Sequence, residues 1–550
     1  MRTAPWYFRR FLERADRDAS RVCLELHSGG TKVSFGEMER GISSAAARLA
    51  DNGVGPGDIV LIFAHHDPGT FFAFFGAQLL GAVPSFMSPP TSRQPVDLWA
   101  RDHAALVARI HPALLVCGEG IRDEIAQLGG SRVLTTGDFE TLRPAPKMQE
   151  CHCVEPDRIA FLQHSSGTTG LKKGVEVTYR QLQAQVESFA SVLGVADEDC
   201  VVSWLPVYHD MGLIAATLMP FALGLPIALL DPMHWLEEPS SYLALLASKP
   251  NSFSWLPNFA FPFLVQRGSL PTGADLSRVR AIVNCSEPCK ASSMASFHSR
   301  FGAHGLPSSA IRVCYAMAEY VFAVTQTEGA ARVLSIDPAV FDSDHRAVPR
   351  PNGRTVVSVG RPLPGTEIRV GNGLRDGDVG ELFVRGPSLC SGYHLAPEIT
   401  AQKFVDGWYR TGDLGFLHEG ELYITGRLDD VIIVRGKNLY AHDVEMLATQ
   451  TGLVRAGRAV AFGLEDAELG TEKLIVVAEV GAAGAERETA KAIRTAILET
   501  YGLSPADVLL VPPDTLVKTS SGKVSRSENR RRYIAKLLKP WVTREGLRAS

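Results

Sequence analysis

Short apolar runs alternate with helix-like stretches along most of this chain, up to about residue 425. The runs DIVLIFAH, PALLVC and PIALLD have the length and composition of buried strands, and TFFAFFGAQLLG and SYLALLAS read as helices that pack on them. Strands that alternate with helices are typical of α/β domains with largely parallel sheets. The sequence therefore predicts an α/β fold, in which a large N-terminal domain holds mixed, largely parallel β-sheets flanked by helices.

Two later regions depart from this pattern. Residues 365–385 consist of short alternating runs separated by turns, which predicts a small antiparallel β unit. From about Val431 the pattern becomes that of a smaller α+β unit, with strand-like runs RAVAFG and KLIVVAEVG and one amphipathic helix. We therefore predict a large domain over residues 1–428 and a small, mobile C-terminal domain over residues 429–550.

Composition and charge exclude several classes of protein. The 550 residues are 45% hydrophobic, and the formal net charge of −4 offers no basic field for nucleic acid. The most apolar stretch, LMPFALGLPIALL, is shorter than the roughly 20 residues of a membrane span, and the Arg-rich N-terminus lacks the apolar segment of a signal peptide. Nine scattered cysteines predict reduced thiols, and the close pairs Cys151/Cys153 and Cys285/Cys289 lack zinc-site spacing. We expect a cytoplasmic protein without an integral membrane segment.

A loop rich in Gly, Ser and Thr, within FLQHSSGTTGLKKG (Phe161–Gly174), follows one of the apolar runs. Backbone N–H groups and hydroxyls in such a loop can surround phosphate oxygens, and the lysines add positive charge. It is not a Walker A loop, because Lys172 stands where the second glycine is required. Taken alone the loop is equally typical of a flexible connection, so the segments that accompany it decide between the two readings.

Several further motifs follow in a fixed order: YAMAE (315–319), YRTGDLG (409–415), GRLDDVIIVRG (426–436) and TSSGKVSR (519–526). Together with SSGTTGLKKG they make the chain resemble the adenylate-forming superfamily over nearly its whole length. That superfamily includes acyl-CoA synthetases, fatty acyl-AMP ligases, luciferases and peptide-synthetase adenylation domains. The sequence departs from the usual motifs at Lys172, where Pro is common, and at Ala316 and Ala318, which replace Gly and Thr.

The segments WLPVYHDMGLI, PNFAF, NCSEP and GELYITGRLDDVIIVRGKNLYAHDVE look most like the fatty acyl-AMP ligase branch. The resemblance implies ATP- and Mg²⁺-dependent activation of a hydrophobic carboxylic acid to an acyl-adenylate, with release of pyrophosphate. The acyl group would then pass to the phosphopantetheine thiol of a carrier protein. Two alternatives stay open: a complete acyl-CoA synthetase that uses coenzyme A, and a non-catalytic acyl- or nucleotide-binding relative.

The resemblance also implies how ATP is held. Its phosphates would contact Ser165, Ser166, Gly167, Thr168, Thr169, Gly170 and Lys173. Its adenine would lie between Asn284, Cys285, Ser286, Glu287 and Pro288 on one side and Tyr315, Ala316, Met317 and Ala318 on the other. Without the resemblance, Lys173 would read as a surface lysine and Tyr315 as a core residue.

Four charged residues receive specific roles from the same resemblance. Glu319 would bind Mg²⁺, which prefers oxygen ligands, and Asp413 would accept hydrogen bonds from the ribose hydroxyls. Arg427 would reach the ribose and phosphates, and Lys523 would neutralise charge on the α-phosphate in the transition state. As bare patterns these are a helix-start carboxylate, a turn, a surface ion pair and a solvated loop lysine.

His209, in YHDMG, invites a metal or acid/base reading. No third ligand is spaced for zinc, and adenylation needs no general base because a carboxylic acid is already ionised near neutral pH. In related enzymes the matching His lies between the ATP site and the acyl tunnel, so the resemblance assigns His209 to positioning. That pocket is expected among residues 208–213, 255–263 and the segment after Glu319. The alternating phenylalanines at 259, 261 and 263 fit a pocket wall and plain core equally well.

In related enzymes the small domain turns about the first Asp of GRLDD, here Asp429. Loop 434–440 would then approach the acyl-adenylate, and Lys437 would meet a phosphopantetheine or coenzyme A phosphate. Residues 327–358 match the place of an extra segment that is thought to restrain this rotation in fatty acyl-AMP ligases. The alternative is a surface excursion without a mechanical role.

Overall fold

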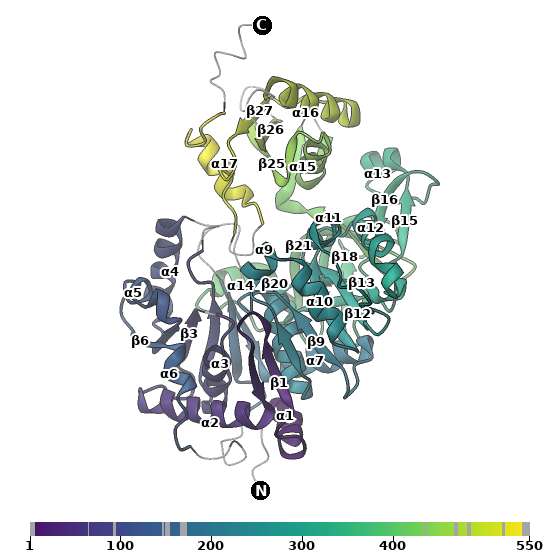
Figure 1. The fold of residues 1–550 in the computed structure, drawn as a ribbon. Coiled ribbons are helices and arrows are strands. Elements are labelled where there is room, and N and C mark those ends of the chain that lie inside the picture. Colours follow the sequence, from purple (N-terminus) through teal and green to yellow (C-terminus); the bar gives the residue numbers. More distant parts are fainter. Residues whose placement is uncertain are drawn as a thin grey trace.

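The large N-terminal domain is built on a nine-stranded sheet of order β17-β14-β13-β12-β11-β9-β10-β1-β2 (Figure 1). The computed structural model describes residues 6–63, 65–91, 95–145, 148, 155–164, 173–434, 437–466, 471–480, 486–519 and 523–541. The strands are β1 (Val22–Leu26), β2 (Thr31–Ser34), β9 (Cys200–Ser203), β10 (Ile227–Leu229), β11 (Ser252–Pro257), β12 (Ala281–Cys285), β13 (Ile311–Ala316), β14 (Ala323–Gln326) and β17 (Arg361–Pro362). The six central strands pair in parallel, and antiparallel β2, β14 and β17 lie at the edges.

A second sheet, fully parallel, has the order β4-β3-β5-β6. Its strands are β3 (Ile59–Phe63), β4 (Val83–Met87), β5 (Leu114–Cys117) and β6 (Arg132–Thr135). The apolar runs that suggested strands fall on β3, β5 and β10, and the two helix-like stretches fall on α3 (Pro68–Leu80) and α10 (Ser240–Ser248). The predicted α/β architecture is confirmed. The sequence could predict it because strands covered on both faces leave continuous apolar runs.

Helices enclose these sheets. Those of the N-terminal domain are α1 (Trp6–Arg17), α2 (Phe35–Asp51), α4 (Val96–Ile110), α5 (Arg122–Ala126), α6 (Thr136–Glu140), α7 (Tyr179–Leu193), α8 (Met219–Leu223), α9 (Pro232–Glu237), α11 (Ala260–Arg267), α12 (Ala291–Phe301), α13 (Pro338–Asp344) and α14 (Pro397–Lys403). Side chains of α4 and α5 pack on one face of the four-stranded sheet, and those of α2 and α3 pack in the main core on the other. α7 shows how the sequence sets such ends: Thr178 and Gln181 form a capping box, and left-handed Gly194 ends the helix.

The predicted antiparallel unit is also present. It consists of β18 (Glu367–Val370), β19 (Gly380–Arg385), β20 (Phe404–Val405), β21 (Trp408–His418) and β22 (Glu421–Arg427). An excursion precedes it, in which β15 (Val333–Ile336) and β16 (Arg354–Val357) pair in antiparallel and α13 lies between them. This excursion falls inside the predicted extra segment 327–358.

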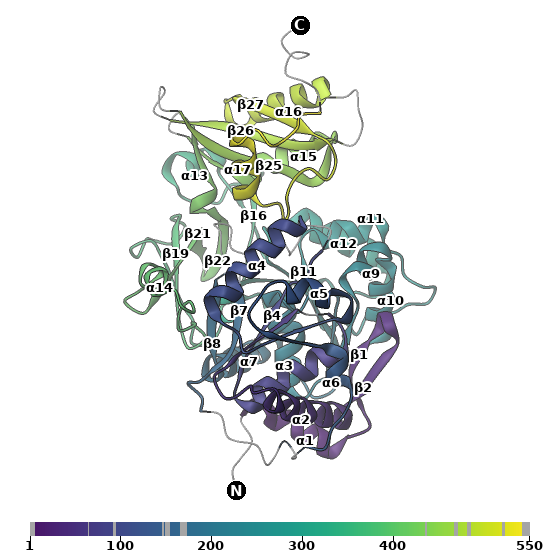
Figure 2. The same ribbon diagram turned by 90° about the vertical axis from the view of Figure 1, so that its left-hand side faces the viewer.

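The smaller C-terminal domain lies above the large one in both ribbon views (Figures 1 and 2). Its elements are β23 (Val431–Val434), β24 (Lys437–Tyr440), α15 (Ala441–Gln450), β25 (Val454–Asp466), β26 (Thr471–Val480), α16 (Glu486–Tyr501), β27 (Asp507–Val511) and α17 (Arg526–Ile534). β25 and β26 are antiparallel, whereas β26 and β27 are parallel. Two buried clusters lie wholly within residues 432–541, so this part has cores of its own. The boundary between residues 428 and 429 stays a prediction.

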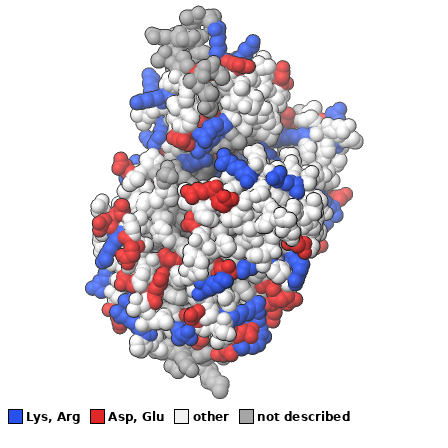
Figure 3. Space-filling view, in the orientation of Figure 1, with Lys and Arg blue, Asp and Glu red and all other residues white. Residues whose placement is uncertain are grey.

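The surface charges and the hydropathy of the helices were compared with what the composition predicts. Figure 3 shows acidic and basic side chains interspersed over the face in view, with several Lys and Arg near the junction of the two domains. Among the described residues, no helix combines the length and apolar character that crossing a membrane requires. The described cysteines are free thiols, and most of them are buried.

Candidate active site

The predicted adenine walls lie at the carboxyl ends of two neighbouring parallel strands. β12 ends at Cys285 and β13 ends at Ala316, and their register pairs Asn284 with Val313. Ser286, the first residue after β12, has a φ of +68°, so the chain turns sharply there. Ligands of open α/β sheets usually bind outside the carboxyl ends of the strands. The two segments that the sequence assigned to adenine are therefore brought to one edge of the sheet.

Residues 284–288 are held by side-chain hydrogen bonds from the neighbouring strand end. Buried Asn284 donates to the Oδ1 atom of Asn258 at 3.0 Å, and the Glu287 carboxylate accepts from the backbone N–H of Phe259 at 2.9 Å. The Sγ atoms of Cys285 and Cys314 lie 3.1 Å apart on adjacent strands. This wall is thus anchored to the end of β11 as well as to β13.

Three predicted nucleotide-binding residues, Tyr315, Asp413 and Arg427, contact one another. Asp413 and Arg427 face each other in the register of β21 and β22, with Arg427 Nε 3.3 Å from Asp413 Oδ1. The Tyr315 hydroxyl donates to the other oxygen of the Asp413 carboxylate. Burial raises the pKa of Asp413, although Arg427 and Tyr315 oppose the shift, and burial beside Asp413 raises the pKa of Tyr315. The arrangement presents a partly buried carboxylate whose partners fix its direction.

Glu319 lies in a 3₁₀ turn (Ala318–Tyr320) directly after the YAM segment. Its Oε1 atom accepts a hydrogen bond of 2.7 Å from Tyr393, whose hydroxyl lies 3.1 Å from that of Tyr409. Two residues later the buried, β-branched Val321 has a φ of +62°, an unusual conformation of the kind that clusters at functional sites. The sequence motifs assign a role to neither tyrosine, although Tyr409 is the first residue of the YRTGDLG motif.

The glycine-rich loop is described only at its ends. β7 (Ile159–His164) and β8 (Gly174–Thr178) pair in antiparallel, with His164 opposite Gly174, so the two ends of the loop are held together. Ser165, Ser166, Gly167, Thr168, Thr169 and Gly170 lie outside the described residues. Lys173 is described, and its ammonium lies over the ring of Tyr393, 5.6 Å from the centroid. The short strand β8 follows the loop, and α7 begins directly after it.

Lys523 connects the C-terminal domain to this edge of the sheet. Its ammonium donates to the carbonyl oxygen of Ser286. Burial tends to raise the pKa of Asp210, but His209 and, to a lesser extent, Lys523 lower it overall. The predicted catalytic lysine thus lies beside the adenine wall and near the YHDMG segment.

Hydrogen bonds and ion pairs hold the residues on both sides of the loop that carries Lys523. Asn529, fully buried, accepts from the N–H of Val517 at 3.0 Å and donates to its carbonyl oxygen at 2.9 Å. Arg526 forms two hydrogen bonds with Glu445 at 2.7 and 2.8 Å and an ion pair with Asp430. Arg526 belongs to the TSSGKVSR motif, but nothing in its spacing identified these partners.

His209 stands at the start of an unusual helix. Its Nδ1 atom lies 2.5 Å from the Asp210 carboxylate, and a π-helix (Met211–Leu218) follows at once. The Thr217 hydroxyl donates to the carbonyl oxygen of Gly212, five residues back, at 2.9 Å. π-helical turns are rare and often occur at functional sites. Within the described ranges, no three His, Cys, Asp or Glu residues are grouped as metal ligands.

The phenylalanines of the predicted acyl pocket divide into two groups. Phe261 is buried and packs on Phe297, with ring centroids 5.1 Å apart, so it belongs to the core. Phe259 is 41% exposed and lies beside Trp204 and Trp235, whose rings stack at 3.7 Å. Phe263 is partly buried and also lies beside Trp235, with ring centroids 5.2 Å apart. The aromatic edge formed by Trp204, Trp235 and Phe259 adjoins the adenine wall through the Phe259–Glu287 hydrogen bond.

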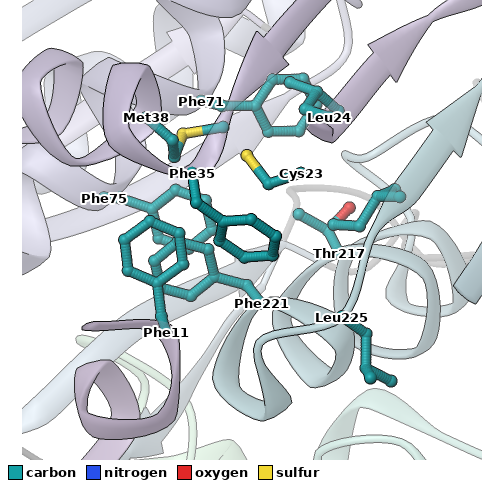
Figure 4. A pocket seen from close by; sticks show the side chains of 11 residues that line it. Phe11, Cys23, Leu24, Phe35, Met38, Phe71, Phe75, Thr217, Phe221 and Leu225 are labelled. Atoms are coloured by element: carbon teal, nitrogen blue, oxygen red, sulfur yellow. The ribbon is translucent and has the colours of Figure 1, made fainter. Parts of the chain in front are cut away.

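A small apolar cavity lies elsewhere, among core side chains of α1–α3, β1 and α8 (Figure 4). Its lining residues are Phe11, Cys23, Leu24, Phe35, Met38, Phe71, Phe75, Thr217, Phe221, Leu225 and Ile227. Only Thr217 comes from the π-helix that begins beside His209. The cavity lies outside the three segments predicted for the acyl pocket.

The excursion contacts the C-terminal domain directly. Arg354 pairs with Asp443 of α15 at 2.6 Å, and Tyr440 shares an apolar cluster with Ile336 and Phe341. Asp429, the predicted pivot, lies in a 3₁₀ turn (Leu428–Asp430) between β22 and β23. The Lys437 ammonium donates to the carbonyl oxygen at the end of α16 at 2.8 Å.

Comparison with known proteins adds independent information. Residues 11–394 match the family described as AMP-binding enzyme. The chain is 31% identical to a long-chain-fatty-acid–AMP ligase, FadD26 of Mycobacterium marinum, over 87% of each chain.

Two solved structures extend the similarity to the whole fold. One comes from a study of fatty acyl-adenylate ligases of E. coli and L. pneumophila; it has a TM-score of 0.87 and 26% identity, covering 97% of this chain and 98% of that one. The other is a fatty acyl-adenylate ligase of L. pneumophila in complex with acyl adenylate and pyrophosphate. Its TM-score is 0.71 at 25% identity, and it covers 97% of this chain and 96% of that one.

Proposed function

Because the chain belongs to the family of AMP-binding enzymes, we propose that it activates a hydrophobic carboxylic acid with ATP. A carboxylate oxygen attacks the α-phosphorus, the bond to the bridging oxygen of pyrophosphate breaks, and an acyl-adenylate forms. One observation carries this proposal: the ammonium of Lys523, from the C-terminal domain, meets the carbonyl oxygen of Ser286 at the adenine wall of the large domain. The similarity to a long-chain-fatty-acid–AMP ligase supports the same reaction.

The reaction joins two anions, so positioning and charge neutralisation supply most of the catalysis. We assign charge neutralisation to Lys523 and Arg427, the ribose hydroxyls to Asp413, and the orientation of the acid to His209. The triphosphate is assigned to Ser165, Ser166, Gly167, Thr168, Thr169, Gly170 and Lys173. Adenine is assigned to Asn284, Cys285, Ser286, Glu287, Pro288, Tyr315, Ala316, Met317 and Ala318.

Glu319 is the residue that we assign to Mg²⁺. This cation binds one or two carboxylates together with substrate phosphates and keeps several waters, rather than filling an all-protein cage. The donors fit: Glu319 is a carboxylate whose direction Tyr393 fixes at 2.7 Å, and no group of three metal-ligating side chains occurs among the described residues. Bound Mg²⁺ would neutralise phosphate charge.

For the second step we propose transfer to the phosphopantetheine thiol of a carrier protein. The ion pair between Arg354 and Asp443, and the apolar cluster that Tyr440 shares with Ile336 and Phe341, tie the C-terminal domain to the excursion, which supports a restrained rotation. The alternative is a complete acyl-CoA synthetase, in which Lys437 would meet a phosphate of coenzyme A. A non-catalytic relative is less well supported, because Glu319, Asp413, Arg427 and Lys523 are all present.

A pyrophosphate-exchange assay over a panel of carboxylic acids tests the proposal. We expect exchange of labelled pyrophosphate into ATP that depends on both Mg²⁺ and a hydrophobic acid, with straight-chain, aryl and polycyclic acids compared at equal concentration. Omission of the acid is the control. Nucleotide binding without acid-dependent exchange, over the whole panel, would favour the non-catalytic relative instead.

A further inference from the structure

A short strap, residues 390–394, crosses between two parts of the site and is bonded to both. The N–H of Cys390 donates to the carbonyl oxygen of Glu319 at 2.8 Å, and the N–H of His394 donates to the carbonyl oxygen of Gly174 at 2.8 Å. Gly174 directly follows Lys173, at the end of the glycine-rich loop. The strap therefore links the 3₁₀ turn that carries Glu319 to the end of the glycine-rich loop at Lys173 and Gly174.

Tyr393, in this strap, contacts one charged group of each part. Its hydroxyl donates to Glu319 Oε1 at 2.7 Å, and its ring receives the Lys173 ammonium 5.6 Å from the centroid. Tyr393 is 6% exposed, and the hydroxyl of the equally buried Tyr409 lies 3.1 Å from that of Tyr393 and also interacts with Glu319. The Tyr393 side chain thus contacts both Glu319, assigned to Mg²⁺, and Lys173, assigned to the triphosphate.

We propose that Tyr393 is a positioning residue that presets Glu319 for Mg²⁺ and Lys173 for the triphosphate. The Tyr393 hydroxyl, with Tyr409 beside it, orients the Glu319 carboxylate, and groups that orient a metal ligand raise metal affinity. The face of an aromatic ring attracts an ammonium group and holds it without neutralising it. This inference rests on the proposed function, because it takes the roles of Glu319 and Lys173 from it.

Tyr393→Phe separates the two contacts, because it removes the hydroxyl and keeps the ring. We expect the Mg²⁺ concentration for half-maximal effect to rise on the order of 10-fold, as for other groups that orient metal ligands. Two readouts should agree: pyrophosphate exchange, and the thermal unfolding midpoint with a non-hydrolysable α,β-methylene ATP, which needs no turnover. The KM for ATP at saturating Mg²⁺ should stay unchanged, because the ring still holds Lys173.

Tyr393→Leu removes the ring as well, so the KM for ATP should rise in addition to the Mg²⁺ requirement. Tyr320→Phe is the matched control: Tyr320 adjoins Glu319, is fully buried, and bonds its hydroxyl to Thr366 at 2.8 Å. That variant should keep the wild-type Mg²⁺ requirement in both readouts.

An unchanged Mg²⁺ requirement in Tyr393→Phe, with acid-dependent exchange intact, would overturn this inference and leave the proposed function standing. An equal rise in Tyr320→Phe would also overturn it, since the effect would then reflect general loosening of the core. If the wild-type protein shows no acid-dependent exchange, the proposed function fails, and the thermal readout with the ATP analogue alone decides about Tyr393.

Discussion

At the scale of single residues, Lys523 is the group on which the proposed chemistry depends most. We propose that it neutralises charge that develops in the transition state, so Lys523→Ala should lower the exchange rate on the order of 10²–10³-fold. The fold should be preserved, because an exposed loop side chain contributes little to a core. Exchange kinetics and a thermal unfolding curve check both statements. Lys539→Ala, which removes another exposed lysine of the same domain, is the control, and near-normal exchange by Lys523→Ala would refute the assignment.

Some residues of the site can be recognised from the sequence, and others only from the folded chain. Asp413, Arg427 and Lys523 lie in ordered motifs, so the sequence singles them out. Tyr393 contacts Glu319 across 74 positions, through a hydroxyl that no local pattern marks. Such contacts depend on how the strap crosses to β8, and only the folded chain supplies that geometry.

At the scale of elements, the loop before α17 is positioned by Arg526, whose planar guanidinium engages Glu445 through two hydrogen bonds. Arg526→Ala should lower the exchange rate on the order of 10–100-fold, since a small misplacement of a catalytic group costs about that much. Arg526→Lys should rescue little, because an ammonium cannot reproduce the two-point contact.

Comparing kcat with the KM for ATP tests this reading. The loss should fall mainly on kcat, because the role that we propose for Lys523 lies in the transition state. Arg531→Ala, which removes an exposed ion pair with Glu528 in the same helix, should behave as wild type. A rise confined to the KM would show that Arg526 acts on nucleotide binding instead.

The same scale shows what the sequence could predict of the fold. Parallel strands covered on both faces leave runs of apolar residues, so the sequence predicts β3, β5 and β10 without any knowledge of their partners. β8 was not predicted, because five residues between a glycine-rich loop and a helix give too short a pattern. The sequence does not predict the π-helix either. All its residues are buried and nearly all are apolar, so no alternation of apolar and polar positions marks a helix there.

At the scale of the whole molecule, the contact between the excursion and the C-terminal domain should decide which thiol accepts the acyl group. Arg354→Ala removes the ion pair with Asp443 and should raise acyl-CoA formation, with pyrophosphate exchange unchanged. Shortening residues 342–354 should do the same more strongly. Chromatography of products formed from ATP, acid and coenzyme A measures the effect.

Two variants make this test specific. Arg350→Ala breaks an ion pair of 2.9 Å with Asp337 inside the excursion and should leave the product ratio unchanged. The exchanged pair Arg354→Asp with Asp443→Arg should restore the wild-type ratio. Rapid, stoichiometric acyl-CoA formation by the unmodified protein would contradict the restraint and favour the synthetase.

The ion pair between Arg354 and Asp443 also bears on the lifetime of the intermediate. An acyl-adenylate is a mixed anhydride that water hydrolyses, and a closed active site protects reactive intermediates from water. Each 1.4 kcal/mol or so that holds the C-terminal domain in place makes its opened form about tenfold rarer. If the C-terminal domain rotates rarely, we expect less acyl-adenylate to be lost to hydrolysis before the acceptor binds. The same restraint should make transfer of the acyl group to the bound acceptor slower.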